Sequence, residues 1–125
     1  MDIEAYLELY SVMYRIRRFE EQAIESFETG DIPGFVHLSI GQEAVPTGVC
    51  AALTKSDLIT STHRGHGHLI AKGGDPKRMM AELFAKKDGY CRGKGGSMHI
   101  SNIDIGMLGA NGMVGAGLPI ATGAA

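Results

Sequence analysis

The spacing of apolar residues between Asp2 and Thr29 constrains the fold more than any other feature of the sequence. Apolar residues recur there at intervals of three and four, with charged residues between them. This period predicts a long amphipathic helix, which must bury one face against the rest of the protein. Gly30 and Pro33 follow and are typical helix terminators. The apolar set is Ile3, Tyr6, Tyr10, Met13, Ile16, Phe19, Ala23, Ile24 and Phe27.

Shorter elements are predicted after this helix. We expect a helix near residues 42–53, with Pro46 in its first turn, where a missing N–H costs little. Residues 56–62, "SDLITST", are typical of a short buried strand, and "RGHGHLIAKGG" of a turn with a short helix. The histidines of that turn should therefore lie where the strand ends.

Residues 75–89, "DPKRMMAELFAKKDG", predict a well-delimited helix. Asp75 is a typical N-cap, Pro76 suits the first turn, and Gly89 is expected to end the helix. The predicted buried side consists of Met79, Met80, Leu83 and Phe84. Residues 90–106 then form a predicted loop, whose length is typical of functional loops.

The segment from Ile105 to Ala125 contains no charged residue. A stretch of about 20 uncharged residues is long enough for a membrane span. Its glycines and polar residues give it low apolarity, however, and its many small residues suit a helix packed closely on neighbours. We therefore predict a buried helix, and no membrane segment. The chain stops at "ATGAA" without a charged last turn or a cap, so we expect residues 1–125 to be the N-terminal portion of a single domain, truncated at Ala125.

Composition excludes several classes of protein. The chain has 125 residues, enough for one domain with a core, and a formal net charge of −2. Such a balance provides no general cationic field for nucleic acid or for an anionic membrane. Cys50 and Cys91 are the only cysteines, and the N-terminus shows no signal-peptide pattern. We expect both to be free thiols in a cytoplasmic protein.

The segment "STHRGHGH", residues 61–68, admits three interpretations. A metal site is one, but the spacing of His63, His66 and His68 matches neither a zincin helix nor a zinc finger, and no acidic residue lies among them. A solvated glycine-rich turn is the second. The third is an anion site, in which the planar fork of Arg64 matches phosphate oxygens and glycines allow backbone N–H groups to approach. Histidines beside such a ligand can also move protons near neutral pH.

Two further glycine-rich segments depart from known phosphate motifs. Residues 93–99, "GKGGSMH", lack the order of a P-loop and follow no strand. Residues 109–117, "GANGMVGAG", match a dinucleotide fingerprint only loosely, and close helix packing explains Gly115 and Gly117 equally well. His37, alone among apolar neighbours, is open to interpretation as a buried hydrogen-bonded histidine.

Four motifs in this order resemble one enzyme family. They are "PGFVHLSIGQEA", "ITSTHRGHGH", "GKGGSMH" and "GANGMVGAGLPIATGAA". Together they resemble the alpha subunit of the thiamine-diphosphate-dependent dehydrogenase component of 2-oxo acid and acetoin dehydrogenase complexes. The resemblance extends from "RRFEE" to the end of the chain. The segment "HRGHGHLIAKGGD" resembles the corresponding segment of acetoin dehydrogenase alpha subunits most, and that of pyruvate dehydrogenase alpha subunits next.

The resemblance implies an α/β fold in which this chain is the helix-rich N-terminal part of a thiamine-diphosphate-binding domain, a parallel sheet flanked by helices. It implies that His63 and Arg64 contact the diphosphate. The residues implied to line the aminopyrimidine are Gly112, Met113 and Val114, with Val114 as the apolar wedge that keeps the cofactor bent. The residues implied to lie near the reacting centre are His37, His66 and His99, with His37 towards the substrate. No role is implied for His68.

The resemblance also implies partners and a reaction. Thiamine diphosphate would lie between this alpha subunit and a beta subunit in an alpha2–beta2 heterotetramer, and the acyl unit from acetoin, pyruvate or a branched 2-oxo acid would pass to a lipoyl-bearing acyltransferase component. The family holds Mg²⁺ through a Gly-Asp-Gly motif and a later Asn, which this chain lacks, so no metal ligand is expected within it. The chain alone is expected to be inactive. A non-catalytic phosphate-binding module and a zinc-dependent hydrolase remain as alternative functions.

Overall fold

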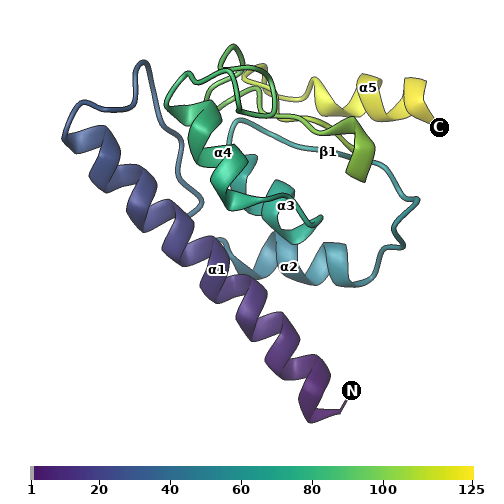
Figure 1. Ribbon diagram of the computed structural model, residues 1–125. Helices are drawn as coiled ribbons and strands as arrows, with labels where there is room; N and C mark the ends of the chain where they lie inside the picture. The colour runs from purple at the N-terminus through teal and green to yellow at the C-terminus, as the bar shows by residue number, and fades with distance from the viewer. Residues whose placement is uncertain (1) are drawn as a thin grey trace.

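The computed structural model describes residues 2–125, and its dominant element is the predicted N-terminal helix, α1 (Ile3–Glu28). The Asp2 side chain caps its first turn by accepting a hydrogen bond from the Ala5 N–H at 2.9 Å. Gly30, with φ of 82°, follows its last turn. The C-terminal half of α1 packs against the rest of the chain, while its N-terminal half projects away (Figure 1). The predicted boundaries of this helix are confirmed to within two residues.

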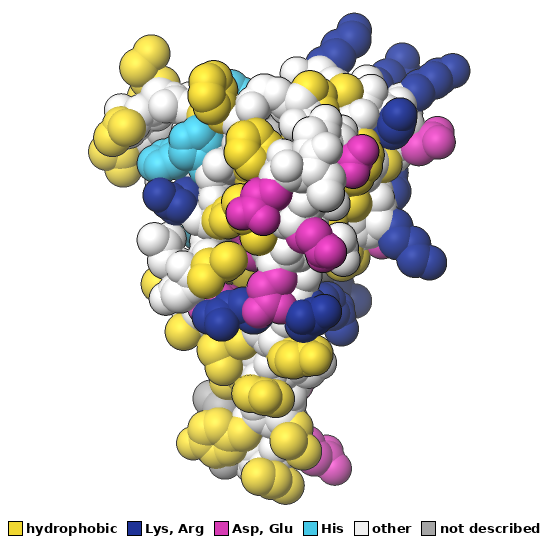
Figure 2. All heavy atoms as spheres, turned by 90° about the vertical axis from the view of Figure 1, so that its left-hand side faces the viewer, with side chains coloured by type: hydrophobic (Ala, Val, Ile, Leu, Met, Phe, Trp, Pro, Cys, Tyr) yellow, Lys and Arg dark blue, Asp and Glu magenta, His cyan; other side chains and the backbone are white. Residues whose placement is uncertain are grey.

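Apolar side chains cover the projecting half of α1, as the lower part of Figure 2 shows. The described residues leave this stripe exposed, although the helical spacing predicted a buried face. The reason is that, within residues 2–125, the neighbours of α1 bury side chains only in its C-terminal half, from Ile16 onward. The exposed stripe consists of Ile3, Tyr6, Leu7, Tyr10 and Tyr14.

Three short helices pack beside the C-terminal half of α1. They are α2 (Ala44–Ala51), α3 (His66–Ala71) and α4 (Pro76–Leu83). α2 and α3 contact each other, and all three contact α1. The buried apolar side chains of α3 and α4 join those of α1 in one cluster with the segment after residue 99. The core residues are Ile16, Phe19, Ala23, Ile32, Leu69, Ile70, Met79, Leu83, Ile100, Met107 and Ala110.

α2 is shorter than the predicted helix 42–53, but it begins two residues before Pro46, as that residue requires. The N-cap of α4 is confirmed, because the Asp75 carboxylate accepts the Lys77 N–H at 2.9 Å. Its predicted end was wrong. The helix stops at Leu83, and Ala85 follows with a left-handed φ of 53°. Residues 84–89 then turn back over the helix.

The strand predicted at residues 56–62 is reduced to β1 (Ile59–Thr60), which is half-buried. β1 pairs in parallel with β2 (Met107–Gly109), with Ile59 opposite Met107 and Thr60 opposite Gly109. A short 3₁₀ helix, η1 (Ile103–Ile105), precedes β2 within the predicted loop. Helices packed beside a parallel strand pair make this an α/β arrangement.

The buried helix predicted over residues 105–125 was wrong. The segment forms β2, an irregular turn and then α5 (Gly117–Ala124). Gly106 and Gly115 have φ of 81° and 84°, which no α-helix accommodates. No residue of α5 is buried, because none of the described elements covers its outer side. Across residues 2–125, no helix has the length and apolarity that a membrane crossing requires.

Candidate functional site

The histidine-rich segment lies where β1 ends, as predicted. Its histidines nevertheless point to different places. His68 is mostly buried, and its Nδ1 lies 3.0 Å from Ser61 Oγ. Burial lowers the pKa of His68 below its ordinary value of 6.5, and a hydrogen bond involving the Arg64 backbone opposes this only in part. His68 is therefore a neutral, locally paired side chain near neutral pH.

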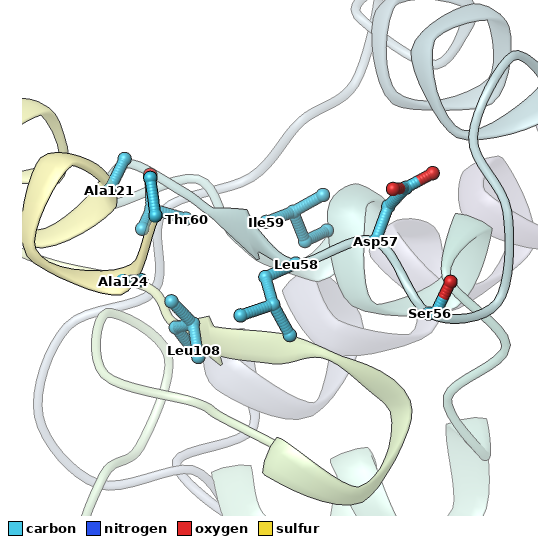
Figure 3. Close-up of a pocket in the computed structure, with 9 residues that line it drawn as sticks. Ser56, Asp57, Leu58, Ile59, Thr60, Leu108, Ala121 and Ala124 are labelled. Atoms are coloured by element: carbon cyan, nitrogen blue, oxygen red, sulfur yellow. The ribbon is translucent and has the colours of Figure 1, made fainter.

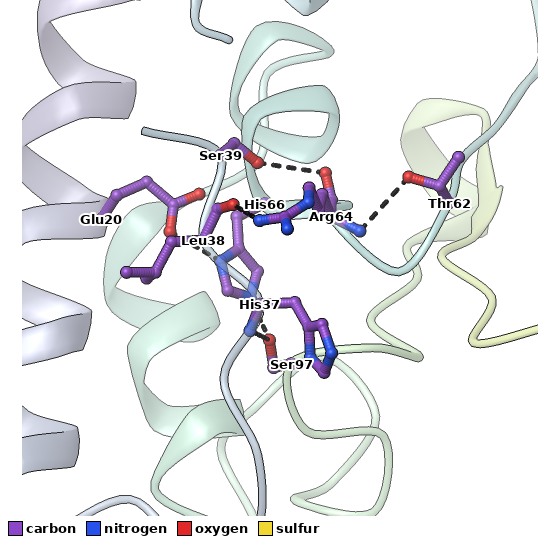
Figure 4. A network of polar contacts seen from close by, with 8 residues as sticks. All are labelled: Glu20, His37, Leu38, Ser39, Thr62, Arg64, His66 and Ser97. Carbon is purple, nitrogen blue, oxygen red and sulfur yellow. Dashed lines mark hydrogen bonds and ion pairs between the residues drawn. The ribbon is translucent and has the colours of Figure 1, made fainter. Parts of the chain in front are cut away.

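His66 begins α3 and lies in the interior, with no exposed surface. Its Nδ1 is 3.0 Å from Glu20 Oε2 on α1, and its Nε2 is 3.0 Å from Ser97 Oγ. The Phe19 ring packs edge-on against it at 5.4 Å. Figure 4 shows the contacts of the imidazole with Glu20 and Ser97. Because both ring nitrogens are engaged, contact with a bound molecule would require breaking one of these hydrogen bonds.

His37 and His63 lie together. Their ring centroids are 5.2 Å apart and the rings are nearly perpendicular, at 87°. The backbone N–H of His37 donates to Ser97 Oγ at 3.0 Å. The Nδ1 atom of His37 is buried and has no hydrogen-bond partner among the described residues. A buried nitrogen without a partner is unusual, and it is suited to accept or donate a bond to a ligand.

Arg64 is held between two segments (Figure 4). Its guanidinium Nη1 donates to the carbonyl of Leu38, and its backbone carbonyl accepts a hydrogen bond from the Ser39 hydroxyl at 3.2 Å. Its own N–H donates to Thr62 Oγ1 at 3.3 Å. A guanidinium carries five N–H donors, so the side chain retains donors for an anion while its position is fixed.

A cavity of about 320 Å³ lies between the end of β1 and the turn before α5. One wall is polar and includes Ser61, Thr62, His63 and His68. The rest of the lining is mostly apolar and comes from the C-terminal segment. It consists of Met113, Val114, Gly115, Gly117, Leu118 and Ala121. The structure thus brings His63 together with Met113 and Val114, although 50 residues separate them in the sequence.

A second cavity, of about 340 Å³, adjoins the strands and α5 (Figure 3). Thr60 and Ala121 line both cavities. Its other walls include Leu58, Leu108 and Ala124, and its one ionisable side chain is that of Asp57. The Asp57 carboxylate would repel a diphosphate, whereas the cavity beside His63 contains no carboxylate and adjoins Arg64 in sequence, so it is the better candidate site.

His99 and Gly112 also lie side by side. A Cβ atom built on Gly112 would lie 3.5 Å from His99 Nε2, which is an ordinary van der Waals contact. His99 is exposed. It does not line the cavity beside His63, and neither do Arg64 and His37, although the His37 ring packs on that of His63.

Three buried polar residues were missed by the sequence analysis. Glu20, Glu82 and Ser97 are at most 5% exposed. Glu20 lies between Ile16 and Ala23 on the apolar face of α1, and a carboxylate inside an apolar stripe was a signal that could have been used. Nothing in the sequence distinguished Ser97 from other serines. Within residues 2–125, no group of three His, Cys, Asp or Glu side chains is arranged to hold a metal ion.

Comparison with known proteins gives consistent results. The sequence profile of the family described as dehydrogenase E1 component matches residues 11–125. The chain is 59% identical to the alpha subunit of acetoin:2,6-dichlorophenolindophenol oxidoreductase from Bacillus subtilis. The aligned 122 residues are 98% of this chain and 37% of that protein. It is 55% identical to the subunit of the same name from Cupriavidus necator, over 100% of this chain and 38% of that protein.

A plant protein is also similar. The alpha-3 subunit of the chloroplastic pyruvate dehydrogenase E1 component from Arabidopsis thaliana is 48% identical over 98% of this chain and 28% of its own length. The chain thus spans little more than a third of the curated relatives that it matches best in these comparisons. The profile match alone covers most of the chain, and the plant relative carries the words E1 component in its name. The chain therefore belongs to the dehydrogenase E1 component family.

Proposed function

We propose that this chain forms the cofactor-binding N-terminal part of an alpha subunit in a thiamine-diphosphate-dependent dehydrogenase. The complete enzyme would cleave acetoin oxidatively, or decarboxylate pyruvate, and transfer the acyl unit to a lipoyl group. The observation that carries the proposal is the cavity in which His63 faces Met113 and Val114. A polar wall opposite an apolar wall suits a ligand with a charged end and a ring.

The residues present fit thiamine diphosphate. Arg64 retains guanidinium donors for a diphosphate, and the orphan Nδ1 of His37 is available to a ligand. Val114 is 87% exposed and Met113 is 73% exposed, so both side chains are available to pack on a ring. When bound, the cofactor would supply a nucleophilic thiazolium carbon for a carbonyl group and a cationic ring that accepts the electrons of the bond that is cleaved.

In this proposal each residue has one task. His63 and Arg64 bind the diphosphate, and Gly112, Met113 and Val114 line the aminopyrimidine. His37, which packs on His63, faces the substrate and holds or moves a proton at its Nδ1. For His66 we propose a positioning role near the reacting centre, since its two nitrogens are bonded to Glu20 and Ser97. For His99, we propose a place in the channel beside Gly112.

Acetoin is the substrate that the most similar of the reported relatives favour, since both bacterial proteins carry acetoin in their names. We further propose a beta subunit as partner in an alpha2–beta2 heterotetramer, a lipoyl-bearing acyltransferase as acceptor, and a cytoplasmic location. Mg²⁺ would be held by residues outside these 125. We expect this chain by itself to be inactive.

The test uses the complete alpha–beta enzyme, with acetoin and pyruvate as alternative substrates and 2,6-dichlorophenolindophenol as electron acceptor. We expect turnover that depends on thiamine diphosphate and is faster with acetoin. Arg64→Ala should raise the Kd for the cofactor at least about tenfold, because a charge-assisted contact to phosphate is lost. Arg15→Ala, on the exposed surface of α1, is the matched control. An unchanged cofactor Kd in Arg64→Ala would favour a non-catalytic phosphate-binding module instead.

A further inference from the structure

Glu82, near the end of α4, is completely buried, yet it pairs with no cationic side chain among residues 2–125. Its carboxylate instead accepts four backbone N–H groups from the following loop. Oε2 accepts those of Cys91 at 2.7 Å and Gly93 at 2.9 Å. Oε1 accepts those of Gly95 at 2.7 Å and Gly96 at 3.1 Å. Four such bonds satisfy a buried carboxylate fully.

The loop has the backbone that this arrangement requires. Nearby backbone N–H groups can converge on one anion where left-handed residues lie among ordinary ones, and such a concave arrangement is called a nest. Arg92, Gly93 and Gly96 have φ of 56°, 75° and 57°. The glycine-rich segment 93–96 therefore binds an anion, but that anion is the protein's own Glu82 and not a phosphate.

Ser97 follows the nest directly and is 5% exposed. Its Oγ lies 3.0 Å from His66 Nε2 and 3.0 Å from the backbone nitrogen of His37. One tautomer of His66 satisfies all three contacts: the His66 Nδ1–H donates to Glu20, the Ser97 hydroxyl donates to Nε2, and the His37 N–H donates to Ser97 Oγ. The three bonds then run in one direction and use every donor once (Figure 4).

We propose that Glu82 and Ser97 are positioning residues for His37. Glu82 fixes the loop, the loop fixes Ser97, and Ser97 fixes the backbone of His37, whose ring packs on His63. The inference rests on the proposed function, in which His37 faces the substrate and His63 and Arg64 bind the diphosphate. It assigns Ser97 to the substrate side of the site and not to cofactor affinity.

The first experiment is steady-state kinetics of the complete alpha–beta enzyme carrying Ser97→Ala. We expect kcat to fall at least about tenfold, since small displacements of a reacting group have effects of this size. The Kd for thiamine diphosphate should stay within about twofold, because Arg64 and His63 keep their own contacts. Ser97→Cys, nearly isosteric and with a weak S–H donor, should give an intermediate kcat. Ser11→Ala, on exposed α1, is the control.

The second experiment is hydrogen exchange of the loop amides in the same complex, which needs no activity. Glu82→Gln replaces one acceptor oxygen by a donor group, so the amides of residues 91–96 should exchange at least about tenfold faster than in the unsubstituted enzyme. Asp88→Asn removes an exposed carboxylate nearby and should leave the exchange unchanged. Glu82→Gln should also lower kcat in the manner of Ser97→Ala.

The outcomes distinguish failure of the proposed function from failure of the positioning role of Glu82 and Ser97. If the unsubstituted enzyme shows no turnover that depends on thiamine diphosphate, the proposed function fails, whereas hydrogen exchange still decides the role of Glu82. If that enzyme is active and Ser97→Ala keeps its kcat, the positioning role is overturned. A loss of cofactor affinity in parallel with kcat overturns it as well. If Ser97→Ala does not assemble, two other results together overturn the positioning role. They are an unchanged kcat in Ser97→Cys and unchanged hydrogen exchange of the loop amides in Glu82→Gln.

Discussion

Glu20 of α1 and His66 of α3 form a fully buried pair, with 3.0 Å between Oε2 and Nδ1. The pair joins the N-terminal helix to the segment that carries Arg64. It also connects, through Ser97, to the backbone of His37. One polar contact in the core thus ties the main helix of the fold to the candidate site.

Removing one member of this pair should destabilise the protein strongly. Glu20→Ala leaves the His66 Nδ1 without a partner in the interior, and we expect a cost of about 3 kcal/mol, within the range for broken buried pairs. Thermal unfolding of the alpha–beta enzyme, followed by circular dichroism, measures the effect as a lower Tm. Glu8→Ala, on the exposed surface of the same helix, should leave Tm nearly unchanged. Equal Tm values for the two variants would contradict the structural role of the pair.

His68 should make stability depend on pH in a mildly acidic range. Burial lowers its pKa in the folded chain, so the unfolded chain takes up the proton first as the pH falls. The contribution is present above about pH 6.5 and is lost as the pH falls from there towards the lower pKa of the folded state. We expect Tm to decrease between pH 7 and pH 5.5, and to decrease less in His68→Asn, whose amide can still contact Ser61.

The pH range over which this Tm comparison reports on His68 has a lower limit. Arg17 lowers the pKa of the Glu43 carboxyl, chiefly through the hydrogen bond of 2.6 Å between them. That stabilisation is present above the ordinary carboxyl pKa and is lost only as the pH falls through the lowered value. Measurements above pH 5 therefore exclude the Glu43 contribution, and the comparison with His68→Asn assigns the remaining slope to His68. Identical slopes for His68→Asn and the unsubstituted enzyme in that range would show that His68 does not titrate differently on unfolding.

Two glycines of the loop around Glu82 should respond differently to alanine. Both have a left-handed φ, but a Cβ on Gly93 would lie 2.4 Å from the Ala85 carbonyl carbon, whereas a Cβ on Gly96 meets open space. Gly96→Ala should cost about 1 kcal/mol of stability from backbone strain alone. Gly93→Ala adds a clash with backbone and should cost about 3 kcal/mol. The difference in Tm between the two variants measures the close approach, and equal values would rule it out.

Val114 should matter for the cofactor and not for folding. Its side chain is 87% exposed, so Val114→Ala should leave Tm unchanged. If the cofactor ring packs on Val114, Val114→Ala removes two methyl groups from the contact. This should weaken thiamine diphosphate binding by about 1.5 kcal/mol, which is about tenfold in Kd. Val45→Ala, exposed on α2, is the matched control and should alter neither quantity. Calorimetric titration of the complete enzyme with thiamine diphosphate distinguishes these results.

Local chemistry made part of this structure predictable. The period of apolar residues and the Asp2 and Asp75 caps depend on neighbours in sequence, so α1 and the start of α4 followed from the sequence alone. The strand exit before His63 was predictable for the same reason. The motifs around Arg64 and Val114 also pointed to one family, to which the chain belongs.

Only the tertiary structure decided the rest. The burial of Glu20 and Glu82 depends on partners 46 and at least 9 residues away, and no local pattern marks such contacts. The same holds for Ser97, which lies 60 residues from the His37 nitrogen that it binds. The prediction of a buried helix over the uncharged segment 105–125 was wrong for two reasons. Glycines with positive φ interrupt any helix there, and none of the described elements covers the outer side of α5. Sequence determined which segments form helices and which residue types carry the chemistry, whereas long-range hydrogen bonds decided which of those residues meet.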